Sequence, residues 1–351
     1  MFESSEARFL QLSVHAVGNK SKGDGITAAQ YPYEPDDDLE AVLTPYFLKS
    51  FKSNETYRLS HETDVNLNEV YAYCRNIFHD PEQFHINSIH LLKHLYNQSE
   101  HPHIKPGEVY IALFDDLVLD GELTRGIGIF KSEQKDVFIQ TNDHGNFVEL
   151  DVKRGIDIKK LDKGCLIFET EEEAGYRAMI VDQNHYDAQY WKDHFLGLVP
   201  DQNEAYHTKN VINLCKDFSR QVIAVDENAK EQALFMARTV EYMQDNEQFT
   251  TESFEEAVFP EAQPEMKEKF QEFKQDYQKA NEVQVETDFE IADETLKQEK
   301  RKIRNTIELD TNVQIKLNFR DLNSGDKFVE RGYDPERGMY YYKVFFNREK
   351  R

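Results

Sequence analysis

Cysteine is scarce in this sequence of 351 residues. The three cysteines are Cys74, Cys165 and Cys215, and none belongs to a Cys-x-x-Cys pair. A disulfide framework or a cysteine-rich zinc site is therefore not expected, and a reduced cytoplasmic setting is the default. Glycine and proline are also scarce, at 15 and 10 residues, which argues against long flexible linkers. At roughly 150 residues per domain, the length predicts two or three domains.

The signals of several common function classes are missing. No apolar run reaches the roughly 18 residues of a membrane-spanning helix, and the first residues lack the basic region and apolar core of a signal peptide. Neither a Gly-x-x-x-x-Gly-Lys-Ser/Thr phosphate loop nor a Gly-x-Ser-x-Gly nucleophile motif occurs. Gly126-Ile-Gly128 lacks the third glycine of a dinucleotide fingerprint. We therefore expect no membrane contact and no cofactor.

Positive charge is in deficit, but unevenly so. The chain has 42 Lys and Arg against 66 Asp and Glu, a net charge of −24. Residues 1–225 have a net charge of −15, residues 226–300 of −13, and residues 301–351 of +4. This distribution excludes a uniformly basic DNA coat but allows one basic end on an acidic body. With 24 Phe, 18 Tyr and one Trp, the chain is too aromatic for a disordered acidic protein.

The hydrophobic pattern predicts an α+β fold with N-terminal helices and an antiparallel sheet, a helical middle region and a small C-terminal β segment. Residues 8–17 alternate between apolar and polar side chains as a half-buried strand does. Asp36 suits the N-cap of a helix that follows it. Short β-rich runs joined by turn residues favour an antiparallel meander from Gly107 onward. The predicted parts are an α+β domain, an acidic helical region and a basic β-rich segment, at 1–185, 186–300 and 301–351.

Signals of catalysis or metal binding are weak. His90 and His94 are four residues apart and would share a helix face, but Leu-Leu-Lys between them lacks the glutamate of a His-Glu-x-x-His zinc site. Surface histidines are the simpler interpretation of the six that lie between 79 and 103, and we predict no metal site. Cys165 is followed by Leu166 and Ile167 in a predicted strand, which favours a buried structural thiol over a nucleophile.

One arrangement resembles that of metal-dependent nucleases. Asp120 precedes Glu133-Gln-Lys135, and both flanks are β-like. Such enzymes place an acid on one strand and Glu-x-Lys on the next, because the metal needs hard oxygen ligands. The pattern is short and frequent by chance in a chain with 31% charged residues. It is kept as an alternative, and turn and edge-strand charges are the simpler interpretation.

Basic side chains that could contact phosphates form two groups. Cations on a β surface bind the DNA backbone without reading base sequence. The larger group lies in the aromatic-rich C-terminal segment and comprises Arg301, Lys302, Arg304, Lys316, Arg320, Lys327, Arg331, Arg337 and Lys343. The smaller group comprises Lys153, Arg154, Lys159, Lys160 and Lys163. Acidic residues are interleaved with both groups, so an ordinary mixed-charge surface is the competing interpretation.

The order of several motifs resembles one known family. It runs through His15-Ala-Val-Gly-Asn19, Gly128-Ile-Phe-Lys-Ser-Glu133, Leu161-Asp-Lys-Gly-Cys-Leu-Ile-Phe168, Tyr190-Trp-Lys-Asp-His-Phe-Leu196, Val313-Gln-Ile-Lys-Leu-Asn-Phe319 and Tyr333-Asp-Pro-Glu-Arg-Gly338. This series is similar to the bacterial nucleoid-associated (NdpA-like) proteins, with the middle block closest to the Bacteroidetes-type branch. The resemblance spans nearly the whole chain, although residues 200–300 contribute least.

The resemblance implies a non-enzymatic protein of the cytoplasmic nucleoid that binds double-stranded DNA with little sequence preference. It also implies topoisomerases or other nucleoid proteins as candidate partners, and it leaves a homo-oligomer open. It transfers no catalytic residue and no DNA-contact motif, so the bases named above follow from charge alone. An acidic adaptor that binds DNA-handling proteins without touching DNA is the first alternative, and a nuclease is the second.

Overall fold

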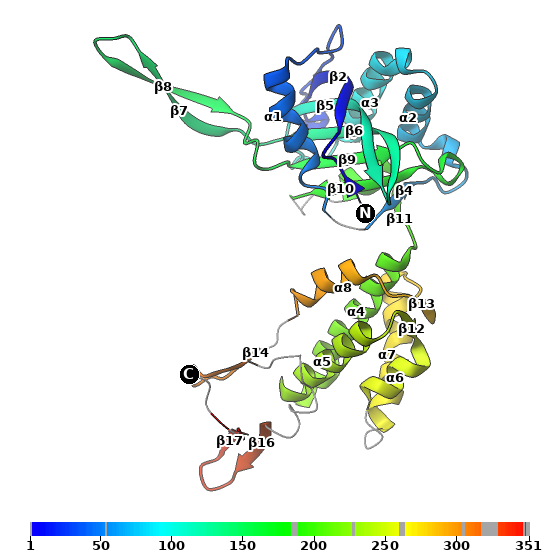
Figure 1. The fold of residues 1–351 in the computed structure, drawn as a ribbon, viewed down its shortest axis with the longest axis vertical. Coiled ribbons are helices and arrows are strands. Elements are labelled where there is room, and N and C mark those ends of the chain that lie inside the picture. The colour runs from blue at the N-terminus through cyan, green and yellow to red at the C-terminus, as the bar shows by residue number, and fades with distance from the viewer. Residues whose placement is uncertain are drawn as a thin grey trace. The chain divides into compact units, whose positions relative to one another are not determined.

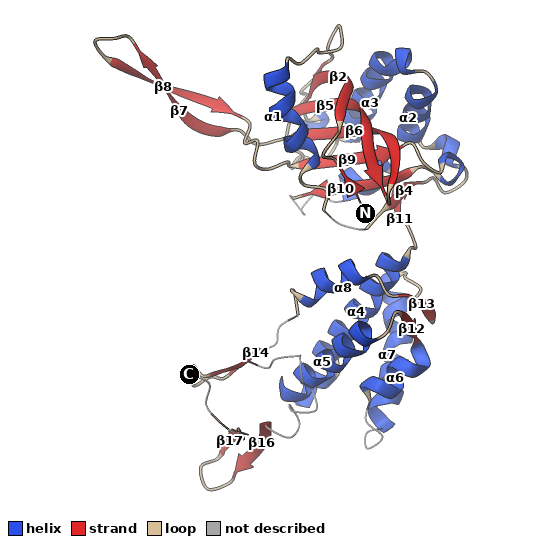
Figure 2. Ribbon diagram, in the orientation of Figure 1, coloured by secondary structure: helices blue, strands red, loops and turns tan. Residues whose placement is uncertain are grey.

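The computed structural model describes residues 2–52, 55–183, 189–226, 229–259, 264–303, 306–316, 329–346 and 348. The chain forms two compact units, Met1–Asp201 and Gln202–Arg351. The first unit contains the long strands, and the second contains a group of helices and short hairpins (Figure 1, Figure 2). This is the α+β class that the sequence predicts. None of the helices in the described ranges has the length and apolar character that a membrane crossing requires.

Nine strands among the described residues of the first unit form one antiparallel sheet, called the large sheet below. Its order is β11-β4-β10-β9-β6-β5-β2-β3, and β1 pairs with β5. The strands are β1 (Phe2–Glu3), β2 (Arg8–Val17), β3 (Ile26–Thr27), β4 (Tyr57–Leu59), β5 (Gly107–Leu119), β6 (Glu122–Ser132), β9 (Lys163–Phe168), β10 (Arg177–Asp182) and β11 (Leu198–Pro200). β5 and β6 meet at Asp120-Gly121, where both residues have positive φ as a tight hairpin turn requires.

Helices cover both faces of the large sheet. On one face lie α2 (Glu69–His79) and α3 (Phe84–Gln98), and on the other lies α1 (Asp37–Leu48). Alternate residues of β5 therefore enter two different cores, Val109, Ile111 and Leu113 beneath α2 and α3, and Tyr110, Ala112 and Phe114 beneath α1. A strand buried on both faces is apolar at successive positions. For this reason β5 lacks the alternation of buried and exposed residues seen in the first half of β2.

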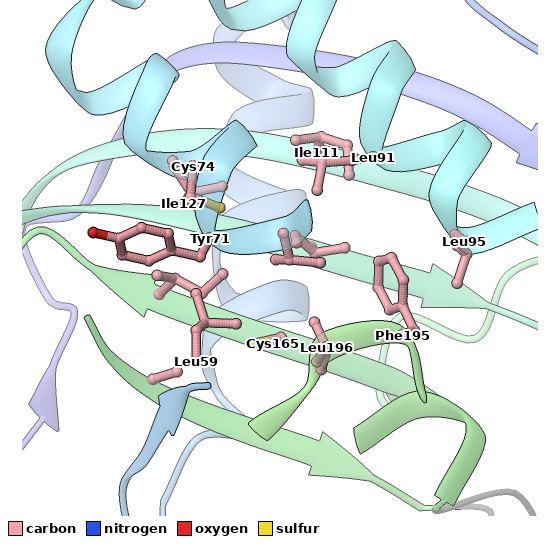
Figure 3. Close-up of a cluster of buried hydrophobic side chains, with 14 of the residues drawn as sticks. Leu59, Tyr71, Cys74, Leu91, Leu95, Ile111, Ile127, Cys165, Phe195 and Leu196 are labelled. Atoms are coloured by element: carbon pink, nitrogen blue, oxygen red, sulfur yellow. The ribbon is translucent and has the colours of Figure 1, made fainter. Parts of the chain in front are cut away.

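The core beneath α2 and α3 also includes the segment just after residue 185. The π-helix η6 (Gln189–Leu196) places Trp191 and Phe195 in this core, beside Leu91 and Leu95 of α3. Figure 3 shows Phe195 and Leu196 among the buried side chains of this cluster. The first unit therefore extends to Asp201, beyond the boundary near 185 that the sequence suggests.

Local signals in the sequence mark the start of α1. Asp36 is its N-cap, and its side chain accepts a hydrogen bond from the backbone N–H of Leu39 at 2.9 Å. Asp37, Asp38 and Glu40 follow in the first turn, where the helix dipole favours negative charge. The helix then places Tyr46 and Phe47 in the core beneath it. The predicted cap is thus confirmed.

A separate hairpin projects from the first unit. β7 (Asp136–Asp143) and β8 (Val148–Gly155) pair only with each other among the described strands. In Figure 1 this ribbon extends away from the large sheet. Most of its residues are exposed to solvent. It is called the β7–β8 arm below.

The second unit is built around aromatic side chains on helices. Its helices are α4 (Glu204–Gln221), α5 (Ala229–Asp245), α6 (Thr251–Val258), α7 (Pro264–Asn281) and α8 (Asp293–Lys300). Phe218 of α4 lies 5.4 Å from Phe235 of α5 and 5.1 Å from Phe270 of α7, measured between ring centroids. Short antiparallel pairs complete the unit: β12 (Gln248–Thr250) with β13 (Asp288–Glu290), β14 (Thr306–Glu308) with β15 (Gln314–Lys316), and β16 (Val329–Asp334) with β17 (Met339–Val344). A separate domain at 301–351 stays a prediction.

Candidate nucleic-acid interface

The β16–β17 hairpin joins a cation to exposed aromatic rings. Its register places Arg331 opposite Tyr342 and Tyr333 opposite Tyr340, so these four side chains share one face. The guanidinium carbon of Arg331 lies 4.2 Å from the centroid of the Tyr340 ring, and the rings of Tyr333 and Tyr340 meet edge to face at 5.1 Å. Tyr333 is 53% exposed and Tyr340 is 60% exposed. Such a face offers one positive charge and flat rings to a polyanion with aromatic bases.

The other two predicted bases of this hairpin have acidic neighbours. Lys343 is paired in register with Glu330, and their charged atoms are 4.0 Å apart. Arg337 lies at the turn, 3.6 Å from Asp334. These exposed pairs are weak, so both cations stay available to exchange partners. The hairpin is therefore locally balanced in charge. Arg331 lies over the ring of Tyr340, and the Lys343 ammonium lies 5.2 Å from the centroid of the Phe345 ring just after β17.

The bases that follow α8 are tied to a buried acid. Lys302 and Lys216 each contact Glu299 at 2.5 Å, and Glu299 is only 3% exposed. Burial opposes ionisation of Glu299, but hydrogen bonds from the two lysines outweigh it, and the pKa of this carboxyl is lowered. Arg301 is exposed beside them. Lys302 therefore combines a structural contact with a surface position.

A shallow basic pocket lies next to this group in the second unit. Lys216, Arg220 and Lys302 line it, together with Ser219 and Gln232. The side chain of Arg220 is 74% exposed, and its nearest acid, Asp217, is 4.0 Å away. Lys216 and Arg220 did not enter the sequence prediction because they belong to an amphipathic helix in the middle of the chain. Their proximity to Lys302 depends on the packing of α8 against α4.

Of the remaining predicted C-terminal bases, the structure describes Lys316. Lys316 ends β15 and is exposed. Arg304, Arg320 and Lys327 lie outside the described residues, so their predicted role stays a prediction.

The residues of the smaller basic group are distributed between the β7–β8 arm and the loop after it. Lys153 and Arg154 are neighbours in β8, so they project from opposite faces of the arm. Lys153 lies 3.2 Å from Asp151. Lys159 and Lys160 are exposed in the turn that follows, where the Asp157 carboxylate accepts a hydrogen bond from the backbone N–H of Lys159. The structure thus brings together Lys159 and Lys160, but not Lys153 and Arg154.

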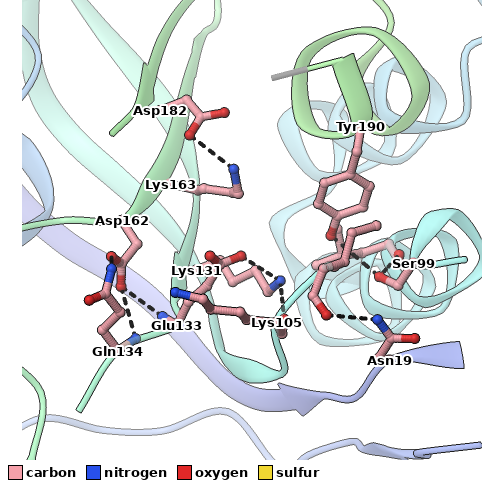
Figure 4. Close-up of polar contacts among 12 residues, drawn as sticks. Asn19, Ser99, Lys105, Lys131, Glu133, Gln134, Asp162, Lys163, Asp182 and Tyr190 are labelled. Atoms are coloured by element: carbon pink, nitrogen blue, oxygen red, sulfur yellow. Dashed lines mark hydrogen bonds and ion pairs between the residues drawn. The ribbon is translucent and has the colours of Figure 1, made fainter. Parts of the chain in front are cut away.

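Lys163 is not a surface residue, which corrects one sequence prediction. Its side chain is fully buried, and its ammonium is 2.9 Å from the Asp182 carboxylate. Figure 4 shows this pair near a second one, between Lys131 and Glu133, which are 2.8 Å apart. Asp162 completes the group by accepting hydrogen bonds from the backbone N–H groups of Glu133 and Gln134. A lysine held in this way contacts its partner acid and has no access to phosphate.

The acids of the nuclease alternative are not assembled. Asp120 precedes β6 and Glu133 follows it, so a strand of 11 residues separates them, about 36 Å along the chain. Asp120 pairs with Arg177 at 2.6 Å, and Lys135 pairs with Glu108 at 2.5 Å. Across the described ranges, no group of three or more His, Cys, Asp or Glu side chains is placed to hold a metal ion.

The clustered histidines have separate structural partners. His94 is 7% exposed and contacts the Glu69 carboxylate at 2.5 Å and the Phe195 carbonyl at 2.9 Å. His90 packs instead against the ring of Tyr73, at 5.3 Å. His79 pairs with Glu172 at 2.8 Å. The two histidines of the predicted shared face therefore have different surroundings.

Cys165 is a core residue of the large sheet. It is fully buried among the side chains of Figure 3, and burial raises the pKa of its thiol. A protonated thiol inside an apolar core is not a nucleophile. The structural interpretation of this cysteine is confirmed.

Comparison with known proteins agrees with the resemblance noted in the sequence. No curated protein matches the chain. A family profile, however, matches residues 13–337, which includes both units and nearly all of the motifs quoted above. Because this match covers most of the sequence, the chain belongs to the family described as nucleoid-associated protein YejK.

Proposed function

We propose that this nucleoid-associated protein binds double-stranded DNA through its phosphate backbone, with little sequence preference, and that it catalyses no reaction. The family supports a place in the cytoplasmic nucleoid. The observation that supports direct contact best is the exposed Arg331–Tyr340 face of the β16–β17 hairpin. Cations on an open β surface contact the phosphates of a duplex, which carry no code for particular base pairs.

The contact surface of this proposal consists of bases that are exposed or partly exposed; Arg331 is partly buried, and the side chain of Lys216 is 15% exposed. In the second unit it comprises Arg301, Lys302, Lys316, Arg331, Arg337 and Lys343, with Lys216 and Arg220 added from the basic pocket. In the first unit it comprises Lys153, Lys159 and Lys160. Lys163 is left out because it is buried, and Arg154 because it projects from the other face of the arm.

The net charge sets the expected strength of binding. Residues 226–300 have a net charge of −13, which repels DNA and leaves few favourable phosphate contacts. Each contact releases counterions, so the affinity should be modest and should fall steeply as salt rises. Filter binding of labelled double-stranded DNA over a series of salt concentrations tests this. The proposal is supported if unlabelled duplexes of unrelated sequence compete equally well for the protein. It is contradicted if no binding is seen at the lowest salt.

The acidic helices favour a second candidate function. In this alternative the carboxylates of residues 226–300 bind basic surfaces of topoisomerase-like, DNA-handling proteins. A pull-down from cell extract with and without nuclease treatment separates the two functions. Partners that persist after DNA is digested support the adaptor, whereas partners that disappear were bridged by DNA.

A further inference from the structure

The β7–β8 arm has one apolar face and one polar face. Residues opposite each other in its register point to the same side, and successive pairs point to opposite sides. One face therefore contains five apolar side chains that are 59–72% exposed: Val137, Ile139, Val148, Leu150 and Val152. This set is called the apolar face below. A monomeric protein rarely leaves so many neighbouring apolar side chains in water.

The opposite face of the arm is occupied by its own contacts. The ring of Phe138, which is 49% exposed, lies over Gly155, where an added Cβ would come within 2.9 Å of the ring. Lys153 pairs with Asp151, and near the tip His144 contacts Glu149 at 3.1 Å. The two faces thus differ in kind, because polar side chains on the second face pair within the arm. This asymmetry makes the apolar face the side suited to a partner.

The charges at the two ends of the apolar face are opposite. Arg154 lies at the base of the arm, opposite Val137, and Asp143 lies at the tip, opposite Val148. These ends are six positions apart along β8, which corresponds to about 20 Å. The Asp143 carboxylate is oriented by a hydrogen bond of 2.7 Å from the backbone N–H of Gly145. The face is therefore an apolar strip with a cation at one end and an anion at the other.

We propose that the apolar face binds the same face of a second copy of this chain, with the two arms antiparallel. When the two-fold axis is perpendicular to the arms, each patch meets itself in reverse, so the ends of one arm face the opposite ends of the other. Arg154 of each copy then meets Asp143 of the partner subunit, while Ile139 and Val152 pack against Leu150 of the partner subunit. A parallel arrangement would instead place like charges together at both ends.

The area of the strip agrees with such a contact. The five apolar residues expose on the order of 500 Å² per copy, the size of the largest and often functional patch on a monomer. Two copies would bury on the order of 1,000 Å², the lower limit for a specific interface. An interface of this size is expected to dissociate on dilution. The apolar face also has no net positive charge to attract DNA, because its charged residues are one base, Arg154, and one acid, Asp143.

Analytical ultracentrifugation of the full chain, after nuclease treatment, tests the arm directly. We expect a monomer–dimer equilibrium for the wild type, and a monomer for Ile139→Glu combined with Val152→Glu. The matched control, Gln140→Glu combined with Asn142→Asp, adds the same charge to the other face of the same arm and should still form dimers. A monomeric wild type overturns the proposal, as does a control that loses the dimer together with the apolar-face variant.

A charge-exchange experiment tests the antiparallel orientation. Arg154→Asp alone and Asp143→Arg alone each place like charges at both contacts of a dimer, and each should raise the dissociation constant at least tenfold. An equimolar mixture of the two variants pairs opposite charges again and should recover dimers as heterodimers. Unchanged dimerisation of the single variants, or no recovery in the mixture, contradicts this geometry. A wild type that stays monomeric while its arm binds anionic lipid vesicles also rejects the dimer, in favour of a membrane surface.

Discussion

Lys131 and Glu133 form a fully enclosed ion pair, with the ammonium and the carboxylate 2.8 Å apart and both side chains at most 1% exposed. Lys131 also donates a hydrogen bond to the carbonyl oxygen of Lys105 at 2.7 Å. The pair gives the glutamate of the Glu-x-Lys pattern a structural role in this chain. That glutamate neutralises a buried lysine two residues earlier.

Removal of one partner of this pair should destabilise the first unit strongly. Glu133→Ala leaves the Lys131 ammonium buried without its counter-charge, which typically costs 3–5 kcal/mol, so we expect a loss of about 4 kcal/mol in the free energy of unfolding. Lys135→Ala is the control, because that lysine is half exposed in its pair with Glu108 and should cost less than about 1 kcal/mol. Urea unfolding measures both. Equal losses for the two variants would contradict the structural role.

His15 should make folding stability depend on pH. Burial, and to a lesser extent the charge of His85, lowers the pKa of His15 to about 4. Its Nδ1 accepts a hydrogen bond from the backbone N–H of Ala29, which fixes the neutral ring with its proton on the Nε2 that contacts Ser88. In the unfolded chain the His15 imidazole binds a proton near pH 6.5. The contribution of neutral His15 to folding stability is therefore complete above that pH and is lost as pH falls toward 4.

Comparison with a non-titrating variant isolates this effect. The stability difference between wild type and His15→Gln should shrink by about 3 kcal/mol between pH 7 and pH 4. His103→Gln, a substitution at an exposed histidine, serves as the control and should change the free energy of unfolding by less than about 0.5 kcal/mol. A constant difference between wild type and His15→Gln across this range would show that His15 does not couple to folding.

Gly175 should tolerate no side chain. Its φ is +97°, and a Cβ there would lie 2.0 Å from the carbonyl oxygen of Leu59. Leu59 belongs to β4 and donates its backbone N–H to the Gly175 carbonyl, so the clash displaces a strand of the large sheet. We expect Gly175→Ala to cost roughly 3 kcal/mol or more. Gly121→Ala, with φ +86° but open space around the Cβ, should cost only about 1 kcal/mol. Thermal unfolding of both variants separates the clash from the backbone strain.

Much of the fold follows from short-range signals in the sequence. The Asp36 cap, the Asp120-Gly121 turn and the helix at 264–281 are all encoded within a few residues of where they act. The three-residue strands β4 and β11 are different, because so short a segment has no periodicity and joins the large sheet only through pairing with distant residues. The extent of the first unit to Asp201 was missed for a similar reason, since Trp191 packs against helices about a hundred residues earlier.

The candidate interface was less predictable than the fold. Charge composition located the basic C-terminal segment, but it did not distinguish an exposed lysine from a buried one. Lys163 and Asp182 are nineteen residues apart and become partners only when β9 pairs with β10. Likewise, Arg331 reaches the ring of Tyr340 only through the register of β16 and β17. Such pairs depend on tertiary structure, which net charge does not describe.

Arg331 should contribute one phosphate contact to DNA binding. Arg331→Gln should weaken binding to all DNA sequences alike and reduce the slope of log affinity against log salt by about 1. Arg8→Gln is the matched control, because it also removes one positive charge but from an exposed arginine paired with Asp116 in the first unit. That variant should leave the salt slope unchanged.

The salt dependence of DNA binding by wild type, Arg331→Gln and Arg8→Gln tests the central claim most directly. The account predicts that the log of the wild-type affinity for unrelated duplexes falls linearly with the log of the salt concentration. Of the two variants, only Arg331→Gln should have a smaller slope. Identical lines for all three proteins would contradict the role of the β16–β17 face. An absence of wild-type binding at the lowest salt would contradict direct DNA contact altogether.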